Sequence, residues 1–450
     1  MSPGQNPQRE FAVDVVERLR AAGFQALWAG GCVRDLLLGR EPHDYDVATD
    51  ARPEQVRQVF GRRQTVAVGA SFGVILVLSE QSEAGSIEVA TFRSEGPYQD
   101  GRRPSRVTFC SAEEDANRRD FTINGMFYDP LAHHVLDYVE GEHDLGQRII
   151  RAIGHAEDRM TEDKLRLLRA VRFAATLEFQ LELQTANAVR KMACEISVVS
   201  TERITQELRK MLLDPHRRRA LELCVDLGLF PVIFPEASRW FSQSELLQSA
   251  EVDSAWGQTL TALSHLAAPT FPLAFATLVA ELVAANAPTI RGLCRRFRLS
   301  NAETEEVVWL LEHRDGLQGI ADWPLHRQKR FLVHPQIREL LEFQRARALS
   351  ADLPVDDILF CEDFLARVPA EDLDPQPLLT GKDLVAAGWK PGPRFREVLE
   401  AVRDAQLAGT VTTPAAAHEL ASRLQADAAR DKTSDRNDTT RRDSRDTLQE

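Results

Sequence analysis

The segment "LWAGGCVRDLLLGREPHDYDVATD", residues 27–50, joins a glycine pair to an aspartate pair across a short helical stretch. Apolar residues lead into Gly30 and Gly31, and residues 34–39 predict a short amphipathic helix that ends at a glycine. A glycine at a strand-to-helix turn lets backbone N–H groups approach an anionic ligand, and the helix N-terminus adds a favourable potential. The glycine pair therefore predicts a cradle for phosphate.

The aspartate pair follows in "YDVAT", which predicts the next strand. Asp44 and Asp46 are two residues apart, so on a strand they point to the same side and could hold a divalent cation. Either motif alone is more often a plain turn or a solvated surface. Because both lie in one strand, turn, helix and strand unit, together they indicate nucleotide chemistry.

Composition limits the class of protein. The chain has 450 residues, of which 43% are hydrophobic, and this predicts two to four compact units. The net charge of −13 argues against unselective coating of nucleic acid, which depends on clustered Lys and Arg. Basic residues nevertheless concentrate in four segments: residues 148–172, 203–219, 291–298 and 327–347. These segments are compatible with an RNA partner held along one face, and solvated helix faces are the alternative.

The cysteines and the N-terminus point to a cytoplasmic protein. The six cysteines are far apart and none forms a C-x-x-C pair, so we expect neither structural zinc nor a disulfide framework. The N-terminus lacks a basic region followed by an apolar run, and no apolar segment is long enough to span a bilayer. We expect no membrane association.

The secondary-structure signals change along the chain. Strand and helix signals alternate from about residue 24 to residue 138, and strand signals nearly vanish beyond residue 145. The predicted strands are residues 24–30, 44–49, 72–78, 86–92 and 134–139, and the predicted helices among them are residues 34–39 and 53–60. From residue 427 the chain is polar and charged, which predicts a disordered tail. We therefore expect an α+β protein with an α/β head and an all-helical remainder.

Glu88 lies on a later predicted strand and could complete a carboxylate triad with Asp44 and Asp46. Two metal ions held by three carboxylates would neutralise a triphosphate and activate an attacking hydroxyl for in-line displacement. We therefore count Glu88 among the catalytic candidates, and an ion pair with Arg93 is the alternative. Residues 92–109 are rich in Gly, Pro and charge, which predicts a mobile loop over the site.

The segment "RRDFTING", residues 118–125, combines side chains suited to a nucleotide. Adjacent arginines, including Arg119, can reach triphosphate oxygens, while Asp120 and Asn124 can hydrogen-bond ribose hydroxyls. The alternative is an exposed R-R-D sequence at the start of a helix.

The segment "TEDKLRLLRAVRFAATLEF", residues 161–179, predicts one amphipathic helix with Thr161 as its N-cap. One side of this helix carries a carboxylate and three guanidinium groups: Asp163, Arg166, Arg169 and Arg172. A carboxylate accepts from an exocyclic amine and a guanidinium donates to ring nitrogen and carbonyl acceptors, so this side can read a base edge. The alternative for Asp163 is stabilisation of the helix N-terminus.

These motifs, in this order, resemble the class II tRNA nucleotidyltransferases, which comprise the CCA-adding enzymes and the bacterial poly(A) polymerases. The matching segments are "GGCVRDLLLG", "HDYDVATDA", "TFRSEGPYQDGRRPSRVTF", "RRDFTINGMFYDP", "EDKLRLLRAVRF" and "ERITQEL". They cover about the first half of the chain, and residues 378–402 resemble a tail segment of the same family. The resemblance implies a DNA polymerase β-like head. The expected parts are an N-terminal helix region (1–23), head (24–145), neck (146–215), helical body (216–345), helical tail (346–425) and disordered C-terminus (426–450).

The resemblance also assigns roles to residues. It implies that Asp44 and Asp46 bind Mg²⁺. It implies nucleotide binding by Gly30, Gly31, Arg34, Arg119, Asp120, Asn124, Asp163, Arg166, Arg169 and Arg172. Asp163 and Arg166 would act as a protein template that selects CTP and then ATP. Glu202 and Arg203 would brace the template helix.

Two departures from the family pattern refine the expected activity. Residues 272–288 carry no His-Asp pair, so we do not expect a second, phosphohydrolase activity. Residues 60–73 only partly resemble the basic, histidine-containing stretch of the poly(A) polymerases, which favours CCA addition. The expected reaction is two-metal nucleotidyl transfer from CTP and ATP to the 3′ end of tRNA with release of pyrophosphate, with tRNA bound at its acceptor region and without a stable protein partner.

Two alternatives remain at this point. One is an A-adding tRNA nucleotidyltransferase or poly(A) polymerase, which would use the same residues with a different primer. The other is a non-catalytic RNA-binding protein, against which the intact D-x-D and R-R-D sequences argue.

Overall fold

The computed structural model describes residues 6–69, 73–95, 107–240, 254–390 and 392–426. The chain divides into two compact units: unit 1 (residues 1–284 and 288–304) and unit 2 (residues 285–287 and 305–450). The division falls within the residues expected to form the helical body, while the finer boundaries stay predictions. The expected disordered C-terminus and most of the expected loop at residues 92–109 lie outside the described residues.

Unit 1 contains a seven-stranded mixed sheet with the strand order β3-β4-β5-β2-β1-β8-β9. Its strands are β1 (Ala26–Ala29), β2 (Asp46–Thr49), β3 (Thr65–Gly69), β4 (Val74–Leu78), β5 (Ser86–Thr91), β8 (Phe127–Asp129) and β9 (His134–Leu136). β2 runs parallel to β5 and antiparallel to β1. β1 and β2 are antiparallel neighbours in the middle of the sheet. The end of β1, where the glycine turn begins, therefore lies beside the start of β2, where the aspartate pair lies.

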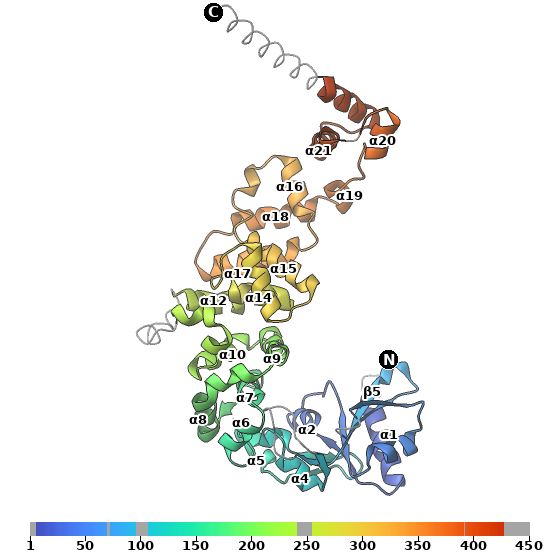
Figure 1. The fold of residues 1–450 in the computed structure, drawn as a ribbon, viewed down its shortest axis with the longest axis vertical. Coiled ribbons are helices and arrows are strands. Elements are labelled where there is room, and N and C mark those ends of the chain that lie inside the picture. Colours follow the sequence, from blue (N-terminus) through green and yellow to red (C-terminus); the bar gives the residue numbers. More distant parts are fainter. Residues whose placement is uncertain (1–5, 70–72, 96–106, 241–253, 391, 427–450) are drawn as a thin grey trace, which may run out of the picture. The chain divides into compact units, whose positions relative to one another are not determined.

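Helix α1 (Pro7–Ala21) packs against the sheet, as Figure 1 shows. Its buried side recurs at helical spacing through Ala12, Val15, Val16 and Leu19, as expected for an amphipathic helix. The indole N–H of Trp28 in β1 donates to the Ala12 carbonyl over 3.3 Å. This contact fixes the strand that leads into the glycine turn.

Shorter elements complete the head. They are α2 (Gly31–Leu37), α3 (Pro53–Phe60), η2 (Ser82–Ala84), β6 (Arg93–Glu95), β7 (Val107–Phe109), α4 (Ala112–Asn117), η3 (Thr122–Asn124) and α5 (Gly141–Gln147). β6 and β7 pair antiparallel, and β10 (Ile149–Ile150) pairs with β11 (Gln180–Leu181) in a separate parallel ladder.

The rest of the described chain is helical. Unit 1 continues with α6 (Ala156–Glu162), α7 (Leu165–Thr176), α8 (Leu183–Met192), η4 (Ala193–Val198), α9 (Thr201–Leu213), α10 (Arg217–Asp226), α11 (Phe230–Ile233), η5 (Pro235–Trp240), α12 (Ala255–His265) and α13 (Phe271–Val279). The division between the units crosses α14 (Ala287–Arg296) and α15 (Asn301–Glu312). Unit 2 contains η6 (Ile320–Asp322), α16 (Leu325–Leu332), α17 (Ile337–Ser350), α18 (Asp356–Arg367), α19 (Ala370–Leu373), α20 (Gly381–Ala386) and α21 (Pro393–Leu407).

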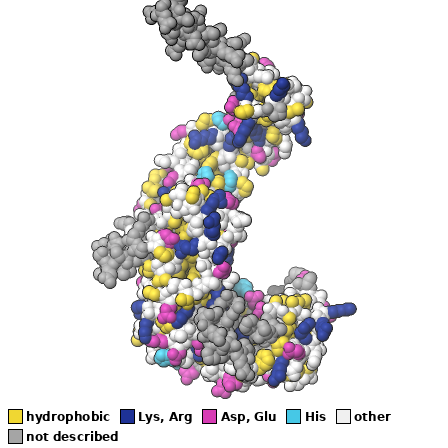
Figure 2. Space-filling view, in the orientation of Figure 1, with side chains coloured by type: hydrophobic (Ala, Val, Ile, Leu, Met, Phe, Trp, Pro, Cys, Tyr) yellow, Lys and Arg dark blue, Asp and Glu magenta, His cyan; other side chains and the backbone are white. Residues whose placement is uncertain are grey.

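The α/β head followed by helices confirms the predicted class. The sequence patterns missed β3 and β8. The ends of the expected loop at residues 92–109 form the paired strands β6 and β7, and the helix expected at residues 34–39 is α2, which begins earlier, at Gly31, and ends at Leu37. The predicted helix at residues 161–179 is in fact two helices, α6 and α7. All six cysteines are free. None of the helices within the described residues is long and apolar enough to cross a membrane. Acidic and basic side chains are interspersed over the visible surface (Figure 2).

Candidate active site

Gly30 forms the predicted turn between β1 and α2, and Gly31 is the first residue of α2. Gly30 has φ 74° and ψ −130°, a backbone conformation that favours glycine. A Cβ atom on Gly30 would lie 3.1 Å from Nη1 of Arg119. The missing side chain therefore allows the Arg119 guanidinium to lie directly against the turn.

The two aspartates flank a buried tyrosine. Asp46 is the first residue of β2, whereas Asp44 precedes the strand, so only one of the pair lies on the strand as predicted. Tyr45 is buried and its ring packs edge-on against Trp28 with centroids 4.8 Å apart. Because the chain is already extended at this point, Asp44 and Asp46 are both exposed on either side of the buried ring.

Glu88 of β5 lies opposite Asp46 in the parallel register of β2 and β5. The pKa of Asp46 is raised to about 6, first by burial of the carboxyl among protein atoms and next by the negative charge of Glu88, with a smaller contribution from Asp44. The Arg119 guanidinium opposes this rise. The Asp46 side chain still keeps an exposed surface.

These carboxylates suit a divalent cation. Carboxylate oxygens are preferred ligands of hard cations, and a cation would relieve the repulsion that raises the pKa of Asp46. Within the described residues, no three His, Cys, Asp or Glu side chains already converge on one point closely enough to form a metal cage. The chemistry of the donor set, carboxylates with one raised pKa, fits a divalent cation.

Asp115 of α4 holds the two arginines of the R-R-D sequence. Its Oδ1 accepts from Nε of Arg118 (2.9 Å) and from the backbone N–H of Arg93 (3.0 Å), and its Oδ2 accepts from Nε and Nη2 of Arg119 (3.2 and 3.0 Å). Burial acts to raise the pKa of Asp115, but Arg119 and Arg118 lower it below its ordinary value. The sequence analysis missed this residue, although D-x-x-R-R places its members on one side of a helix.

Arg119 is fixed on its other side as well. Its Nη1 donates to the carbonyl of Asn124 over 3.3 Å, and its guanidinium carbon lies 4.9 Å from the centroid of the Phe127 ring. The arginine predicted to bind triphosphate is therefore held rigidly beside Gly30 and Asp46.

Asp120 is occupied by partners within the protein. Its Oδ2 accepts from Nε and Nη2 of Arg169 (2.8 and 2.5 Å), and its Oδ1 accepts from the backbone N–H of Phe121 (2.9 Å) and the amide of Asn124 (3.1 Å). Burial acts to raise the pKa of Asp120, but Arg169 and Asn124 outweigh it and lower the pKa to about 2. The side-chain Oδ1 of Asn124 in turn accepts from Nη1 of Arg34 over 2.9 Å. The ribose contact predicted for Asp120 stays a prediction, and in this structure the carboxylate joins the head to α7.

The ion-pair chain continues into α9 through Glu207. Glu207 is buried, its Oε2 accepts from Nε of Arg172 over 2.5 Å, and its Oε1 lies 3.9 Å from Nη1 of Arg169. The ring of Phe173 lies under three guanidinium groups, with centroid distances of 3.9 Å to Arg172, 5.2 Å to Arg169 and 5.3 Å to Arg34. Glu207 and Phe173 were not predicted, although Glu207 follows Arg203 by four residues in "ERITQEL" and so shares its helix side.

The predicted template helix breaks at Asp163. Helix α6 ends at Glu162, Asp163 has the extended angles φ −140° and ψ 105°, and α7 begins at Leu165. The prediction of one helix from Thr161 was therefore wrong. The reason is local, because Oδ1 of Asp163 accepts from the Leu165 N–H over 3.0 Å, and aspartate favours this non-helical capping role over a helix interior.

Arg203 reaches Asp163 as predicted, and Glu202 does not. Nη1 and Nη2 of Arg203 donate to the two carboxylate oxygens of Asp163 over 3.0 and 2.6 Å. Glu202 instead lies 3.2 Å from Nε of Arg298. Of the two residues expected to brace the template helix, Arg203 contacts Asp163, whereas Glu202 is paired with Arg298.

Arg166 is buried and anchored at the first turn of α7. Its Nη1 donates to the Arg159 carbonyl (2.9 Å) and to Oε2 of Glu162 (2.6 Å), and its Nη2 donates to the Arg118 carbonyl (3.0 Å). These bonds use three of the five N–H groups of a guanidinium, which leaves two for a ligand. The bond to Arg118 also ties the predicted template to the R-R-D segment.

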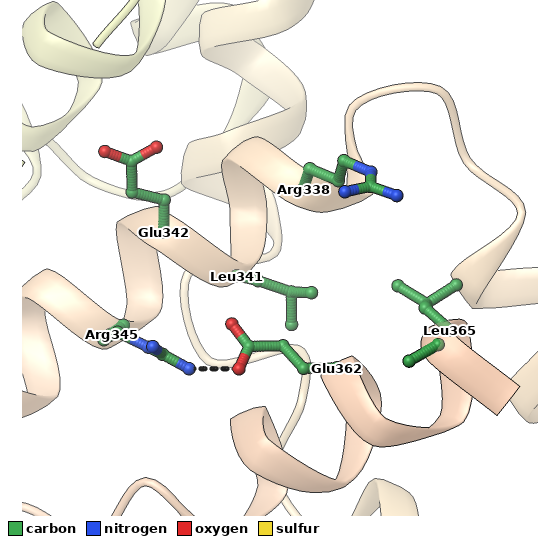
Figure 3. A pocket seen from close by; sticks show the side chains of 7 residues that line it. Arg338, Leu341, Glu342, Arg345, Glu362 and Leu365 are labelled. Carbon is green, nitrogen blue, oxygen red and sulfur yellow. Dashed lines mark hydrogen bonds and ion pairs between the residues drawn. The ribbon is translucent and has the colours of Figure 1, made fainter. Parts of the chain in front are cut away.

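A pocket of about 450 Å³ lies elsewhere, between α17 and α18 of unit 2 (Figure 3). It is lined by Arg338, Leu341, Glu342, Arg345, Glu362, Leu365 and Ala366. Arg345 donates to Glu362 over 2.5 Å at its side. The predicted site residues all belong to unit 1, whereas the residues that line this pocket belong to unit 2.

Comparison with known proteins gives consistent matches. Residues 26–151 match the family described as "Poly A polymerase head domain", and residues 178–241 match "Probable RNA and SrmB- binding site of polymerase A". A CCA-adding enzyme of Lactococcus lactis subsp. cremoris is 31% identical over 402 residues, covering 87% of this chain and 90% of the relative. One from Streptococcus mutans is 34% identical over 407 residues, covering 89% and 93%.

Solved structures agree on the fold. The crystal structure of the Bacillus stearothermophilus CCA-adding enzyme in complex with CTP matches with a TM-score of 0.73 and 28% identity, covering 97% of this chain and all of that one. The Thermotoga maritima CCA-adding enzyme complexed with tRNA matches in fold with a TM-score of 0.59 at 19% identity.

Proposed function

Because the chain belongs to the family of CCA-adding enzymes, we propose that it adds cytidine, cytidine and adenosine to the 3′ end of tRNA in the cytoplasm. The substrates are CTP, ATP and a tRNA that lacks its terminal nucleotides, and the second product is pyrophosphate. In each step the primer 3′-oxygen bonds to the α-phosphorus of the nucleotide, and the bond from that phosphorus to the pyrophosphate oxygen breaks. The observation that carries the proposal is the register of Asp46 opposite Glu88, next to the turn at Gly30.

Asp44 and Asp46 are the residues that would hold Mg²⁺, with Glu88 beside them. The bound ion would neutralise the triphosphate and lower the pKa of the primer hydroxyl. Arg119 supplies a fixed positive charge for triphosphate oxygens, and Gly30 keeps the path to it open. Arg34, held by Asn124 and Asp35, adds a second charge on the α2 side.

Base selection falls to Asp163 and Arg166. A carboxylate accepts from the exocyclic amine that cytosine and adenine share, while uracil presents an acceptor at the equivalent position. The two N–H groups of Arg166 that remain can donate to ring acceptors. Arg203 holds Asp163 and the Arg118 carbonyl holds Arg166, so both template groups are pre-positioned before the nucleotide arrives.

Primer extension tests the activity. Purified protein is incubated with tRNA that ends before CCA, and separately with tRNA that ends in CC, with CTP and ATP together, and the product 3′ ends are sequenced. We expect CCA on the first tRNA and one adenosine on the second. Incorporation of ATP alone would identify an A-adding enzyme, and long A tails on unrelated RNA would identify a poly(A) polymerase.

Replacement of the metal-binding pair separates an enzyme from a non-catalytic RNA-binding protein. The double variant Asp44→Ala and Asp46→Ala should lose transfer while its affinity for tRNA stays within about threefold, because phosphate contacts elsewhere supply most RNA affinity. Asp50→Ala is a matched control, since this exposed aspartate follows β2 and its carboxylate accepts from the Gln25 backbone N–H. Turnover that survives the double change would remove the metal assignment.

A further inference from the structure

A row of contacting rings lies in unit 2, where α15 and α16 meet. Its members, which we call the aromatic row, are Trp309, His313, Trp323, Arg327, Phe331 and His334. Arg327 and Phe331 are four residues apart in α16 and so share one side of that helix, while Trp323 precedes α16 and His334 follows it. Trp309 of α15 and His313, which directly follows α15, are also four residues apart.

The rings contact one another in sequence. The His334 ring stacks on Trp309 with centroids 3.8 Å apart and planes 4° apart, and Phe331 lies 5.6 Å from Trp323. His313 connects the two halves, 4.9 Å from Trp309 and 5.5 Å from Phe331. The row is thus a continuous series of flat groups.

The row ends at the cationic side chain of Arg327. The guanidinium carbon of Arg327 lies 3.8 Å from the centroid of the Trp323 ring, and Arg327 is exposed. A guanidinium plane is itself a surface on which nucleic-acid bases stack. The row can therefore be extended by one more flat group at the Arg327 end.

The aromatic row is not part of the core. All five rings are partly exposed, whereas Gln328 and Leu332 of the same helix are buried. The Gln328 amide donates to the carbonyls of Ile320 and Ala321 over 2.9 and 3.1 Å and so fixes the neighbouring side of α16 to η6. Helix α16 thus has one anchored side and one aromatic side that reaches solvent.

The charge of α16 favours an anionic partner. Its sequence "LHRQKRFL" contains three Lys or Arg residues and a histidine, and no acidic residue. Arg330 is paired with Asp404 over 2.6 Å, whereas Arg327 and Lys329 have no carboxylate within ion-pair distance among the described residues. Figure 2 shows His, Lys and Arg side chains beside hydrophobic ones on the visible face of unit 2.

We propose that the aromatic row is an RNA-binding surface, on which an unpaired base of the substrate RNA stacks at Arg327 and Trp323 while the Arg327 charge attracts the RNA phosphates. Exposed rings next to a cation without a carboxylate partner match single-stranded or looped RNA, which offers both a base plane and phosphates. An acidic protein would satisfy the cations and leave the series of rings without a role. That the RNA is tRNA rests on the proposed function.

Dissociation constants test this surface. They are measured for tRNA lacking CCA and for a 20-base-pair RNA duplex without unpaired bases, at several salt concentrations. The variants are Arg327→Ala, Trp323→Ala and Trp323→Phe. Arg367→Ala is the matched control, since Arg367 is an exposed arginine of unit 2 that pairs with Asp363 on its own helix.

Each variant has a distinct expected result. Trp323→Ala should weaken tRNA binding by about 5- to 150-fold and leave duplex binding unchanged, as the loss of one base stack predicts. Trp323→Phe should keep tRNA affinity within about threefold, because it retains a ring. Arg327→Ala should weaken tRNA binding and reduce the salt slope of its affinity by about one.

The outcomes that overturn the proposal are clear. Unchanged tRNA affinity in both Trp323→Ala and Arg327→Ala would mean that the row does not bind RNA and serves a protein partner or packing. An equal loss of affinity for tRNA and for the duplex in Trp323→Ala would exclude base stacking. An equal loss in Arg367→Ala would show an unspecific charge effect. Failure of the parent protein to extend tRNA would overturn the proposed function, and the affinity comparison would still decide the role of the row.

Discussion

Replacing Asp120 by asparagine should destabilise unit 1 strongly, because its carboxylate holds Arg169 and Asn124 at the junction of the head and α7. The pKa of Asp120 falls from 3.8 to about 2 in the folded protein. At 1.36 kcal/mol per unit, this shift corresponds to about 2 kcal/mol of net stabilisation by its partners. Loss of the charge also leaves the partly buried Arg169 poorly compensated, so we expect a total loss of about 2 to 4 kcal/mol.

Urea unfolding followed by circular dichroism measures this loss, and hydrogen exchange at the Phe121 amide, which donates to Asp120 over 2.9 Å, reports it locally. Asp363→Asn is the control, because Asp363 and Arg367 form an exposed pair that should contribute less than about 0.5 kcal/mol. If Asp120→Asn lowers the free energy of unfolding by no more than this control does, the junction does not depend on the Asp120 carboxylate and the reasoning fails.

Three further changes test the site. The pKa of Asp120 is lower in the folded protein than in the unfolded chain, so its stabilising effect should be fully present above about pH 4 and disappear as pH falls through about 2. The urea unfolding midpoints of the parent protein and of Asp120→Asn should therefore converge over that range. Gly30→Ala should raise KM for CTP about 10-fold or more, since it strains a positive φ and crowds Arg119 at 3.1 Å, and an unchanged KM would contradict the close approach. Asp163→Ala should reduce discrimination of CTP over UTP by about 5- to 150-fold in single-nucleotide incorporation on truncated tRNA; a preserved ratio together with lower stability would mean that Asp163 serves only as the cap of α7 and the partner of Arg203.

The sequence predicted the parts of the site that depend on local geometry. A glycine with positive φ between a strand and a helix, and carboxylates on either side of one buried residue, are both set by neighbours within a few positions. Gly30 and the pair Asp44 and Asp46 were therefore recognisable. The placement of Glu88 beside Asp46 also followed once a sheet was expected, although its register needed the structure.

The partners of the charged residues could not be predicted in the same way. Asp115 lies near its arginines in sequence, but Asp120 and Arg169 are 49 residues apart, and Arg172 and Glu207 are 35 apart. Such pairs form only when α4, α7 and α9 pack together. The break before α7 was missed for a related reason, because a capping aspartate and a helical aspartate in a first turn give the same sequence pattern.

These long-range pairs reduce the number of residues that we expect to act as the protein template. The sequence offered four charged groups on one side of a helix, and Arg169 and Arg172 are paired with Asp120 and Glu207. Arg169 bonds Asp120 through Nε and Nη2, and Arg172 bonds Glu207 through Nε, so each arginine is fixed by a buried carboxylate that would be left uncompensated if the arginine moved toward a base. Asp163 keeps unused lone pairs and Arg166 keeps two unused N–H groups, so both can bind a base without giving up the bonds that orient them. We therefore propose that these two residues select the base, while Arg169 ties α7 to the head through Asp120 and Arg172 ties α7 to α9 through Glu207.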